Sequence, residues 1–405
     1  MQTTACIGTG PINKLLARLP AALDIEATAR QYGAFSRSRR IKSGTALLHL
    51  ALAYGVGELS LRDTAAWATL NGAAMSDVAV LERLRLPAVA AWLGAILETV
   101  LATCRHEAAR ATAGWRVRIL DATTVSGPGA AAAWRLHAGY DLAGQRLTAI
   151  EIGDDKASES LGRFKIGPGE IALADRAYLK ARDLRAVGEA GGHFIVRAGW
   201  NAVRWRTIDG EPFDLFAMLD RLAWGEHAET AVMIWPERTA RDAFSVRLVV
   251  RRLDKAAAEA SRARARHAAR KEQRRIQPQT LKAAEFVLLV TSLEEHAFAA
   301  ADILALYRRR WQVELAFKRM KSLFGLDELP AKDPDLARTW LYAKLIANLL
   351  AEDMTREILD APPSARRHPA DPFLLDLAYP ENARAYHPRR HHRPYHRADM
   401  ATAKG

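Results

Sequence analysis

A short segment of the chain places a carboxylate among side chains that bind anions. Within residues 307–321, Glu314 is accompanied by Tyr307 and Arg310, seven and four positions before it, and by Lys321, seven positions after it. At ~100° per residue, the four side chains fall within about 60° of one another on an α-helix. The spacing predicts a polar stripe on one helix, where basic groups could grip phosphate oxygens beside an acid.

Apolar residues border this stripe on both sides, so it does not coincide with a solvated face. A charged stripe between two apolar borders predicts that this helix face lies at the mouth of a cleft. A carboxylate in such a position indicates a function. The alternative is an ordinary amphipathic helix with an Arg310–Glu314 pair. The borders are Leu304, Trp311 and Leu315 on one side and Leu306, Val313, Phe317 and Phe324 on the other, whereas Arg308, Arg309, Gln312 and Arg319 point away.

Charge narrows the partner to a polyanion. The 405 residues carry a net charge of +13 and are 49% hydrophobic, enough for two or three packed domains. Nucleic acid is favoured over a membrane surface, because no run of eighteen uncharged apolar residues exists and the first residues lack the order of a secretory signal. Cys6 and Cys104 are too few for a disulfide framework or a zinc ribbon. We expect a cytoplasmic, nucleoid-associated protein without a membrane segment.

The first part of the chain predicts helices only. Ser60 can cap a helix over 61–70, Asn71 and Gly72 can end it, and Ser76 can cap the next helix. Two short helices around such a turn resemble a helix-turn-helix, and a plain helical hairpin is an equally good interpretation. Together with the basic run 37–42, they favour a DNA-binding region. The expected helices cover 11–16, 45–54, 61–70, 76–84 and 88–104.

From residue 115 the pattern changes to strands, and two of them end on acids. The run 115–120 alternates and ends on Asp121, followed by a loop by composition, and 170–174 ends on Asp175. An acid at the carboxyl end of a buried strand is well placed for chemistry. The runs 133–140 and 146–153 predict a hairpin, 180–189 a helix and 193–197 another strand.

Three acids could act together. Asp121 or Asp175 alone could be a helix cap or turn former. With Glu314 they could hold two divalent ions ~4 Å apart, the arrangement that two-metal phosphoryl transfer requires. The neighbouring acids Asp141, Glu151, Asp154 and Asp155 are interpreted as turn or surface residues.

These blocks resemble the DDE transposases of the insertion-sequence-4 family. Tyr307, Arg310, Glu314 and Lys321 match that family's Y-(2)-R-(3)-E-(6)-K signature. The stretch 119–124 is similar to the block with its first Asp, and 174–178 to the block with its second. Ala177 stands where that second block commonly has Gly, which tightens the backbone and removes no reactive group. The resemblance covers 115–330.

The resemblance implies an α/β fold: a ribonuclease H-like catalytic core interrupted by a mainly β insertion, with an all-α N-terminal DNA-binding domain. Glu314 follows Asp175 by 139 positions, which leaves room for the insertion. Within it, 228–235 and 244–251 predict strands and 286–291 returns the chain to the core. The expected divisions are the N-terminal domain 1–112, the core 113–199, the insertion 200–283, the second part of the core 284–360 and a basic Pro/His-rich, flexible tail 361–405.

The insertion closes with a strongly basic helix, in which seven of the fourteen residues 262–275 are Lys or Arg. This density favours phosphate contact over a merely solvated face. Tryptophans in or beside the insertion are candidates for stacking on a base, with core packing as the alternative. The basic residues are Arg262, Arg264, Arg266, Arg270, Lys271, Arg274 and Arg275, and the tryptophans are Trp200, Trp205, Trp224 and Trp235.

The implied activity is cut-and-paste DNA transposition of an insertion sequence by a Mg²⁺-dependent endonuclease and strand transferase. Asp121, Asp175 and Glu314 would hold two Mg²⁺ ions, with Mn²⁺ as a substitute, while Tyr307, Arg310 and Lys321 grip DNA. The partners would be double-stranded DNA with terminal inverted repeats, target DNA and a second copy of the chain on DNA. Two alternatives stay open: an inactive or domesticated DNA-binding relative, and a ribonuclease H-like nuclease without strand transfer.

Overall fold

The computed structural model describes residues 9–111, 114–128, 133–154, 156–235, 243–326 and 329–360. Two compact units are distinguished, residues 1–350 and residues 351–405. The first unit contains every element described below up to Leu350. Of the second unit, the described residues are the last turns of the helix Pro334–Asp360. The predicted basic tail 361–405 lies outside the described residues.

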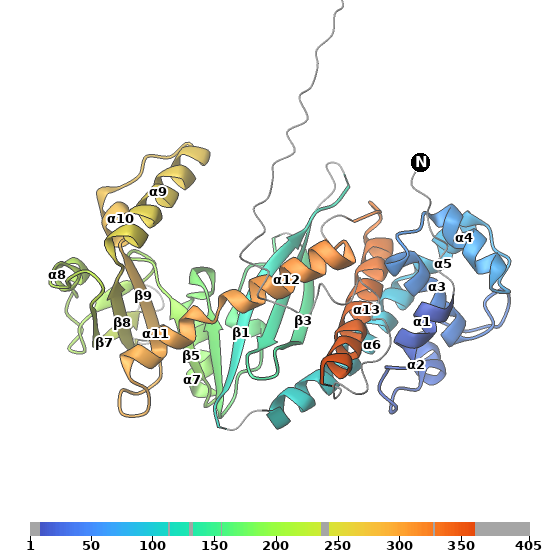
Figure 1. The fold of residues 1–405 in the computed structure, drawn as a ribbon, viewed down its shortest axis with the longest axis horizontal. Helices are drawn as coiled ribbons and strands as arrows, with labels where there is room; N and C mark the ends of the chain where they lie inside the picture. The colour runs from blue at the N-terminus through green and yellow to red at the C-terminus, as the bar shows by residue number, and fades with distance from the viewer. Residues whose placement is uncertain are drawn as a thin grey trace, which may run out of the picture. The chain divides into compact units, whose positions relative to one another are not determined.

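The described residues before 112 form helices and no strands, as the pattern predicted, but one of the six helices, Ile25–Gln31, was not predicted (Figure 1). The Ser60 and Ser76 side chains accept hydrogen bonds from the amides of Asp63 and Ala79, as capping predicts. Gly72, at φ +83°, makes the left-handed turn between these two helices. The helices are α1 (Thr9–Leu16), α2 (Ile25–Gln31), α3 (Gly44–Val56), α4 (Leu61–Leu70), α5 (Asp77–Leu84) and α6 (Pro87–Ala111).

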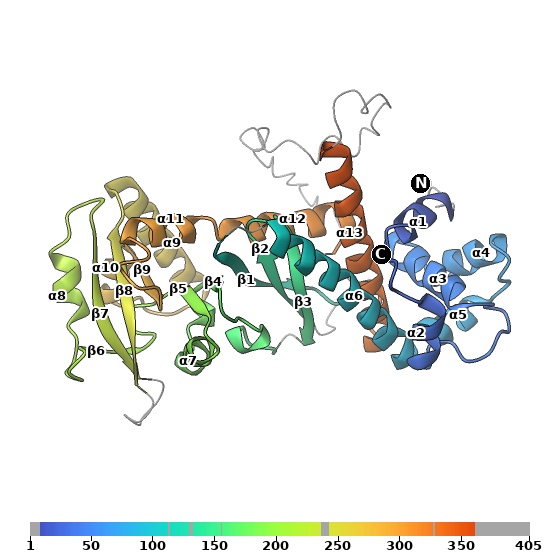
Figure 2. The same cartoon turned by 90° about the horizontal axis from the view of Figure 1, so that it is seen from below.

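Helix α6 is longer than its pattern indicated. Over Pro87–Arg110 it is long and apolar enough to cross a membrane, the only such helix among the described residues, and 50% of its most apolar window is buried inside the protein. Trp92 and Ile96 have no exposed surface, and the helix packs on the edge strand of the sheet (Figure 2). The burial of these side chains and the contact with the sheet are those of a core helix.

One nine-stranded mixed sheet runs in the order β3-β2-β1-β4-β5-β9-β8-β7-β6. Strands β1, β4 and β5 are mutually parallel, and the other pairings are antiparallel. The predicted hairpin is present as β2 and β3. The strands are β1 (Arg116–Val125), β2 (Trp134–Asp141), β3 (Arg146–Asp154), β4 (Glu170–Ala174), β5 (His193–Arg197), β6 (Arg204–Arg206), β7 (His227–Trp235), β8 (Phe244–Arg252) and β9 (Phe286–Thr291).

The strands that lie between β5 and β9 in the chain extend this sheet. Strand β9 pairs with β5 on one side and with β8 on the other, so β6 to β8 continue the ladder outward. Shared backbone hydrogen bonds make the added strands a rigid extension of the first five. Three helices lie between β6 and β9 in the chain: α8 (Leu215–Asp220), α9 (Lys255–Lys271) and α10 (Pro278–Ala283).

The two faces of the sheet have separate apolar cores. Alternation along β1 sends Ile119 to one core and Leu120 to the other. The Ile119 core is shared with the N-terminal helices, α11 (Ala300–Arg308), α12 (Trp311–Phe324) and α13 (Pro334–Asp360). Helix α7 (Ala181–Glu189) packs in the Leu120 core. In both views α11 and α12 run end to end across the sheet (Figures 1 and 2).

The prediction of one continuous helix over 307–321 was wrong. Helix α11 ends at Arg308 and α12 starts at Trp311, because the intervening amides bond three residues back: Arg309 to Leu306 and Arg310 to Tyr307. Arg310 keeps helical angles, with φ −52° and ψ −34°, so the polar side chains still share a face. Trp311, predicted as an apolar border, is half exposed.

The prediction that Asp121 ends its strand was also wrong. Strand β1 continues to Val125, with Asp121 opposite Ala138 and Val125 opposite Trp134 of β2. The segment 122–125 is rich in Thr and Val, which suit a pleated strand once a partner strand is present. The acid therefore lies within a strand that is paired on both sides up to Leu120.

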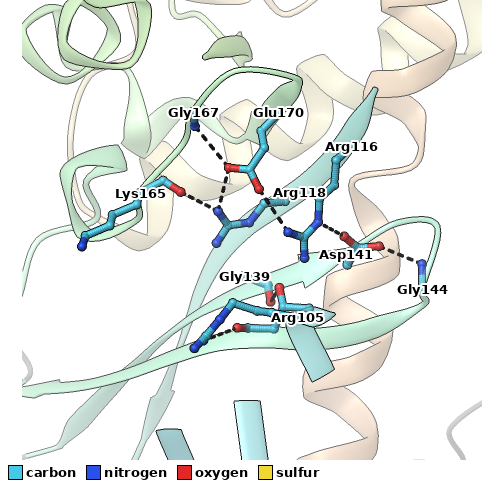
Figure 3. A network of polar contacts seen from close by, with 10 residues as sticks. Arg105, Arg116, Arg118, Gly139, Asp141, Gly144, Lys165, Gly167 and Glu170 are labelled. Carbon is cyan, nitrogen blue, oxygen red and sulfur yellow. Dashed lines mark hydrogen bonds and ion pairs between the residues drawn. The ribbon is translucent and has the colours of Figure 1, made fainter. Parts of the chain in front are cut away.

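A buried ionic network joins the start of β1 to its neighbours (Figure 3). Arg116 binds Asp141 of β2 at 2.6 Å and Glu170 of β4 at 3.2 Å, and Arg118 binds Glu170 at 3.3 Å. Asp141 also accepts from the Gly144 amide at 2.7 Å. The interpretation of Asp141 as a turn residue is confirmed, but it is not on the surface: its side chain has no exposed area.

Candidate active site

Asp121 of β1 is brought opposite Glu314 of α12 by the packing of that helix on the sheet. Alternation places Asp121 on the face of Ile119, which α12 covers. Arg310 connects the two carboxylates, since its guanidinium binds Asp121 Oδ2 at 3.1 Å and also Glu314 Oε1. The arginine that precedes α12 thus forms an acid–base–acid bridge between strand and helix.

Lys321 makes a second contact between α12 and β1. Its Nζ donates a hydrogen bond to the carbonyl oxygen of Thr124 at 2.7 Å. Lys321 lies about two turns along α12 from Glu314. Between the two anchors lies a cleft of about 460 Å³ with charged and apolar walls. Its lining residues are Asp121, Ala122, Thr123, Glu314, Phe317, Lys318, Lys321 and Ser322. The cleft predicted beside the stripe is confirmed.

Asp175 stands directly after β4, the parallel neighbour of β1. Its carboxylate accepts from the Ala177 amide at 2.9 Å and caps the 3-10 helix η2 (Arg176–Tyr178). Its negative charge also raises the pKa of Asp121. The capping role that the sequence left open is therefore real, and it coexists with a position close to the other acid.

The pKa of Asp121 is raised to about 6. Burial is the main cause, and repulsion from Asp175 and Glu314 adds to it, against the Ala122 amide and Arg310, which lower the pKa. The side chain is 15% exposed, whereas that of Glu314 is 55% exposed. A carboxyl with this balance is stabilised in its charged form by any added cation.

Tyr307 lies on α11, close to Arg310 in the same site. Burial raises the pKa of its hydroxyl, while the charges of Arg197 and Arg310 oppose that shift. The negative charge of Asp175 raises the pKa of Tyr307 further. Electrostatic interaction thus groups the tyrosine with Arg310 and Asp175, although it belongs to a different helix from Glu314.

Within the described part of the chain, no three His, Cys, Asp or Glu side chains gather closely enough to hold a metal ion. Asp121 and Glu314 instead share the guanidinium of Arg310. The place nonetheless suits a cation, because carboxylate oxygens are the donors that hard divalent ions prefer and one positive group already bridges two of them.

One acid near the site was missed by sequence reasoning. Glu159, between β3 and β4, is 19% exposed and forms an ion pair with Arg135 at 3.7 Å. Burial raises its pKa, and the charge of Asp175 raises it further. Nothing in its sequence spacing distinguishes Glu159 from a surface residue, because only the fold brings its loop beside β4.

The basic helix α9 lies at the β7–β9 end of the sheet and not beside α12 (Figure 1). Arg262 is engaged with Glu259 and, at 2.6 Å, with Glu285. Arg266 contacts Glu259 at 3.4 Å and Arg274 contacts Glu272 at 2.6 Å. Four further cations are exposed with no ion pair among the described residues: Arg264, Arg270, Lys271 and Arg275.

The four tryptophans differ in their surroundings. Trp205 is buried and donates to the Trp200 carbonyl at 2.8 Å, and Trp200 donates to Thr280 at 3.2 Å. Arg252 covers the ring of Trp224 at 3.8 Å. Trp235 lines a large cavity of about 1220 Å³, together with Lys180, Arg182 and Arg204.

Comparison with known proteins agrees with this geometry. Residues 113–350 match the family model described as "Transposase DDE domain". The chain is 40% identical over 354 residues to the putative transposase InsL for insertion sequence element IS186A of Escherichia coli (strain K12), covering 86% of this chain and 95% of that protein. It is equally similar over 355 residues to the transposase for insertion sequence element IS421 of Escherichia coli, with the same coverage.

A more distant relative is the transposase for insertion sequence element IS231F of Bacillus thuringiensis subsp. israelensis, at 25% identity over 58% of this chain and 55% of that protein. The family match covers the two strands and the helix that carry the three acids. The chain therefore belongs to the DDE transposases, the DNA transposases that cleave and transfer DNA strands.

Proposed function

We propose that this transposase, one of the insertion-sequence-4 family, excises and inserts its own element by a cut-and-paste reaction, with Asp121, Asp175 and Glu314 as its catalytic acids. The observation that carries the proposal is the bridge from Asp121 through Arg310 to Glu314 across a single cleft, with Asp175 following the adjacent parallel strand. Asp121 and Glu314 line this cleft and Asp175 stands close by after a third element, so acids from three elements are available for phosphoryl transfer.

A ribonuclease H-like core is supported by the order of the first five strands, β3-β2-β1-β4-β5, in which the hairpin lies on one side of β1 and the parallel strands on the other. The proposed division keeps an all-α DNA-binding domain at 1–112, the core at 113–199 and 284–360, and the insertion at 200–283. Helices α4 and α5 would contribute a helix-turn-helix to the first of these.

DDE transposases generally use divalent metal ions. We infer that Asp121, Asp175 and Glu314 would hold two Mg²⁺, or Mn²⁺ in substitution, which would activate the attacking oxygen and stabilise the leaving oxygen. Arg310 would move from Asp121 and bind a DNA phosphate bidentately, Lys321 would bind a neighbouring phosphate, and Tyr307 would donate a hydrogen bond to one.

The proposed substrate is double-stranded DNA with terminal inverted repeats, joined to target DNA by a homodimer formed on DNA. Trp235 is the best placed of the four tryptophans to stack on a base, because its cavity has basic walls. The chain would act in the cytoplasm, at the nucleoid.

The direct test uses a linear DNA fragment that carries both ends of the element encoding the chain. With Mg²⁺, we expect strand breaks at those ends and joined products when a target plasmid is added. EDTA should prevent both. Specific binding without breaks would indicate a DNA-binding relative, and breaks without joining would indicate a nuclease.

Protons should compete with the metal at Asp121. Its pKa of about 6 lies above the ordinary value of 3.8, so the folded chain holds this proton more tightly than the unfolded chain. Without metal, ionisation of Asp121 therefore lowers the free energy of unfolding progressively as the pH rises from about 4 to 6. With metal, we expect the Mg²⁺ concentration for half-maximal cleavage to rise about tenfold from pH 7 to pH 5. A constant requirement across this range would contradict the assignment.

The exposed cations of α9 should set the salt dependence of DNA binding. Each cation that no longer binds a phosphate lowers the slope of log K against log salt by about one. We expect Arg264→Ala combined with Lys271→Ala to weaken binding and lower the slope by about two, as measured by fluorescence anisotropy. Arg262→Ala, which removes a cation already bound to Glu259 and Glu285, is the matched control and should change the slope less.

A further inference from the structure

Lys344 is a buried cation that the proposed chemistry does not use. It lies on α13 within the first unit, and its side chain is 2% exposed. Its ammonium group lies 4.5 Å from the ring centre of Trp340. Burying a charge this completely is costly unless strong partners replace water. Its partners therefore indicate what it is kept for.

Two of those partners are the last carbonyls of α12. Nζ donates to the carbonyl of Phe324 and, at 3.4 Å, to that of Gly325. Gly325 ends the helix in the left-handed conformation, with φ +55°. A cation at this end satisfies carbonyls that have no partner within the helix and complements the negative end of its dipole. Lys344 thus caps the helix that carries Glu314.

The third partner comes from the N-terminal helices. Nζ binds Glu58 Oε1 at 3.1 Å, and Glu58 lies in the short connection between α3 and α4 with φ +49°. A Cβ added to Gly325 would stand 2.5 Å from the same Glu58 oxygen. Three segments therefore meet around one ammonium group: the α3–α4 connection, the end of α12 and the middle of α13.

We propose that Lys344 is a positioning residue that holds α12 on the catalytic strand and couples it, through Glu58, to the α4–α5 pair. The inference rests on the proposed function, because it presumes that Glu314 and Lys321 act on DNA. Helix α12 has 14 residues, so displacement of its end moves both side chains relative to Asp121. Misplacement by ~1 Å can lower a rate about 100-fold.

The test compares Lys344→Met, which keeps an unbranched side chain one atom shorter and removes its charge, with Lys344→Arg and the full-length wild-type chain. We expect Lys344→Met to bind end DNA within about twofold of wild type and to cleave ~10–100-fold more slowly in single-turnover reactions. Lys344→Arg restores a cation and should cleave faster than Lys344→Met. Lys332→Met, which removes an exposed lysine before α13, should match wild type.

The reaction profile separates positioning from folding. Partial unfolding lowers the amplitude of product formation at an unchanged rate constant, whereas a displaced helix lowers the rate constant at full amplitude. A wild-type rate constant for Lys344→Met would overturn the inference while leaving the proposed function intact. Absence of end cleavage by the wild-type chain would instead overturn the proposed function.

Two further variants test the same contact without changing Lys344, in case Lys344→Met does not fold. Glu58→Gln changes a side chain that is 69% exposed, and Gly325→Ala adds the methyl group that would meet Glu58. Both should lower the cleavage rate constant at unchanged DNA affinity. If both cleave at the wild-type rate, the coupling does not exist.

Discussion

Asp121→Asn is expected to abolish strand cleavage, with a loss on the order of 10³-fold or more, while leaving DNA binding within about twofold. The substitution keeps the size of the side chain and its hydrogen bond with the Ala122 amide, at 2.8 Å, but removes the charge that Arg310 and a metal would share. The rate should be measured in single-turnover reactions with DNA ends and Mg²⁺, and affinity by anisotropy.

Glu314→Gln should produce the same loss, because the opposite wall of the cleft then lacks its carboxylate. Asp154→Asn removes an exposed carboxylate at the end of β3 and serves as the control, with cleavage near the wild-type rate. If either catalytic variant retained more than a tenth of the wild-type rate, the assignment of these acids would fail.

Asp141→Ala should be the most destabilising change away from the cleft, by about 3–5 kcal/mol in the free energy of unfolding. Its side chain is fully buried, and its removal takes away the 2.6 Å ionic partner of Arg116 and the carboxylate that accepts from the Gly144 amide. The network in Figure 3 joins β1, β2 and β4, so the loss acts on the strands that carry Asp121 and precede Asp175.

Urea unfolding followed by circular dichroism measures this loss. Asp141→Asn retains an acceptor for Gly144 and loses only the ionic partner, so we expect a smaller effect than for Asp141→Ala. Asp154→Asn again provides an exposed control, expected to lie within about 0.5 kcal/mol of wild type. A change below about 1 kcal/mol for Asp141→Ala would show that the network contributes little.

Much of the secondary structure could be predicted because it depends on local chemistry. Ser60 and Ser76 cap the helices that follow them, Gly72 turns the chain between them, and β4 ends before Asp175, as their side chains require. The spacing of Arg310, Glu314 and Lys321 survives the break at Arg309 and Arg310, because three-residue hydrogen bonds keep the backbone close to helical.

The errors arose where long-range partners override local signals. Residues 122–125 were predicted as a loop because Ser, Gly and Pro follow them, and they form strand because β2 supplies hydrogen bonds to them. Asp141 has a turn signature in sequence, and only the neighbouring Arg116 and Glu170 make it an internal ionic group. Glu159 and Lys344 give no sequence signal, since their partners lie on segments distant in the chain.

By itself, the sequence determined the residue types of the site, the helical spacing of its bases around Glu314 and the caps and turns that delimit the elements, because these follow from side-chain chemistry and backbone periodicity over a few residues. Only the tertiary structure decided that Arg310 bridges Asp121 and Glu314, that β6 to β8 lengthen one sheet, and that Lys344 joins α12 to Glu58. These depend on burial and pairing between segments up to 286 positions apart, which local periodicity does not encode.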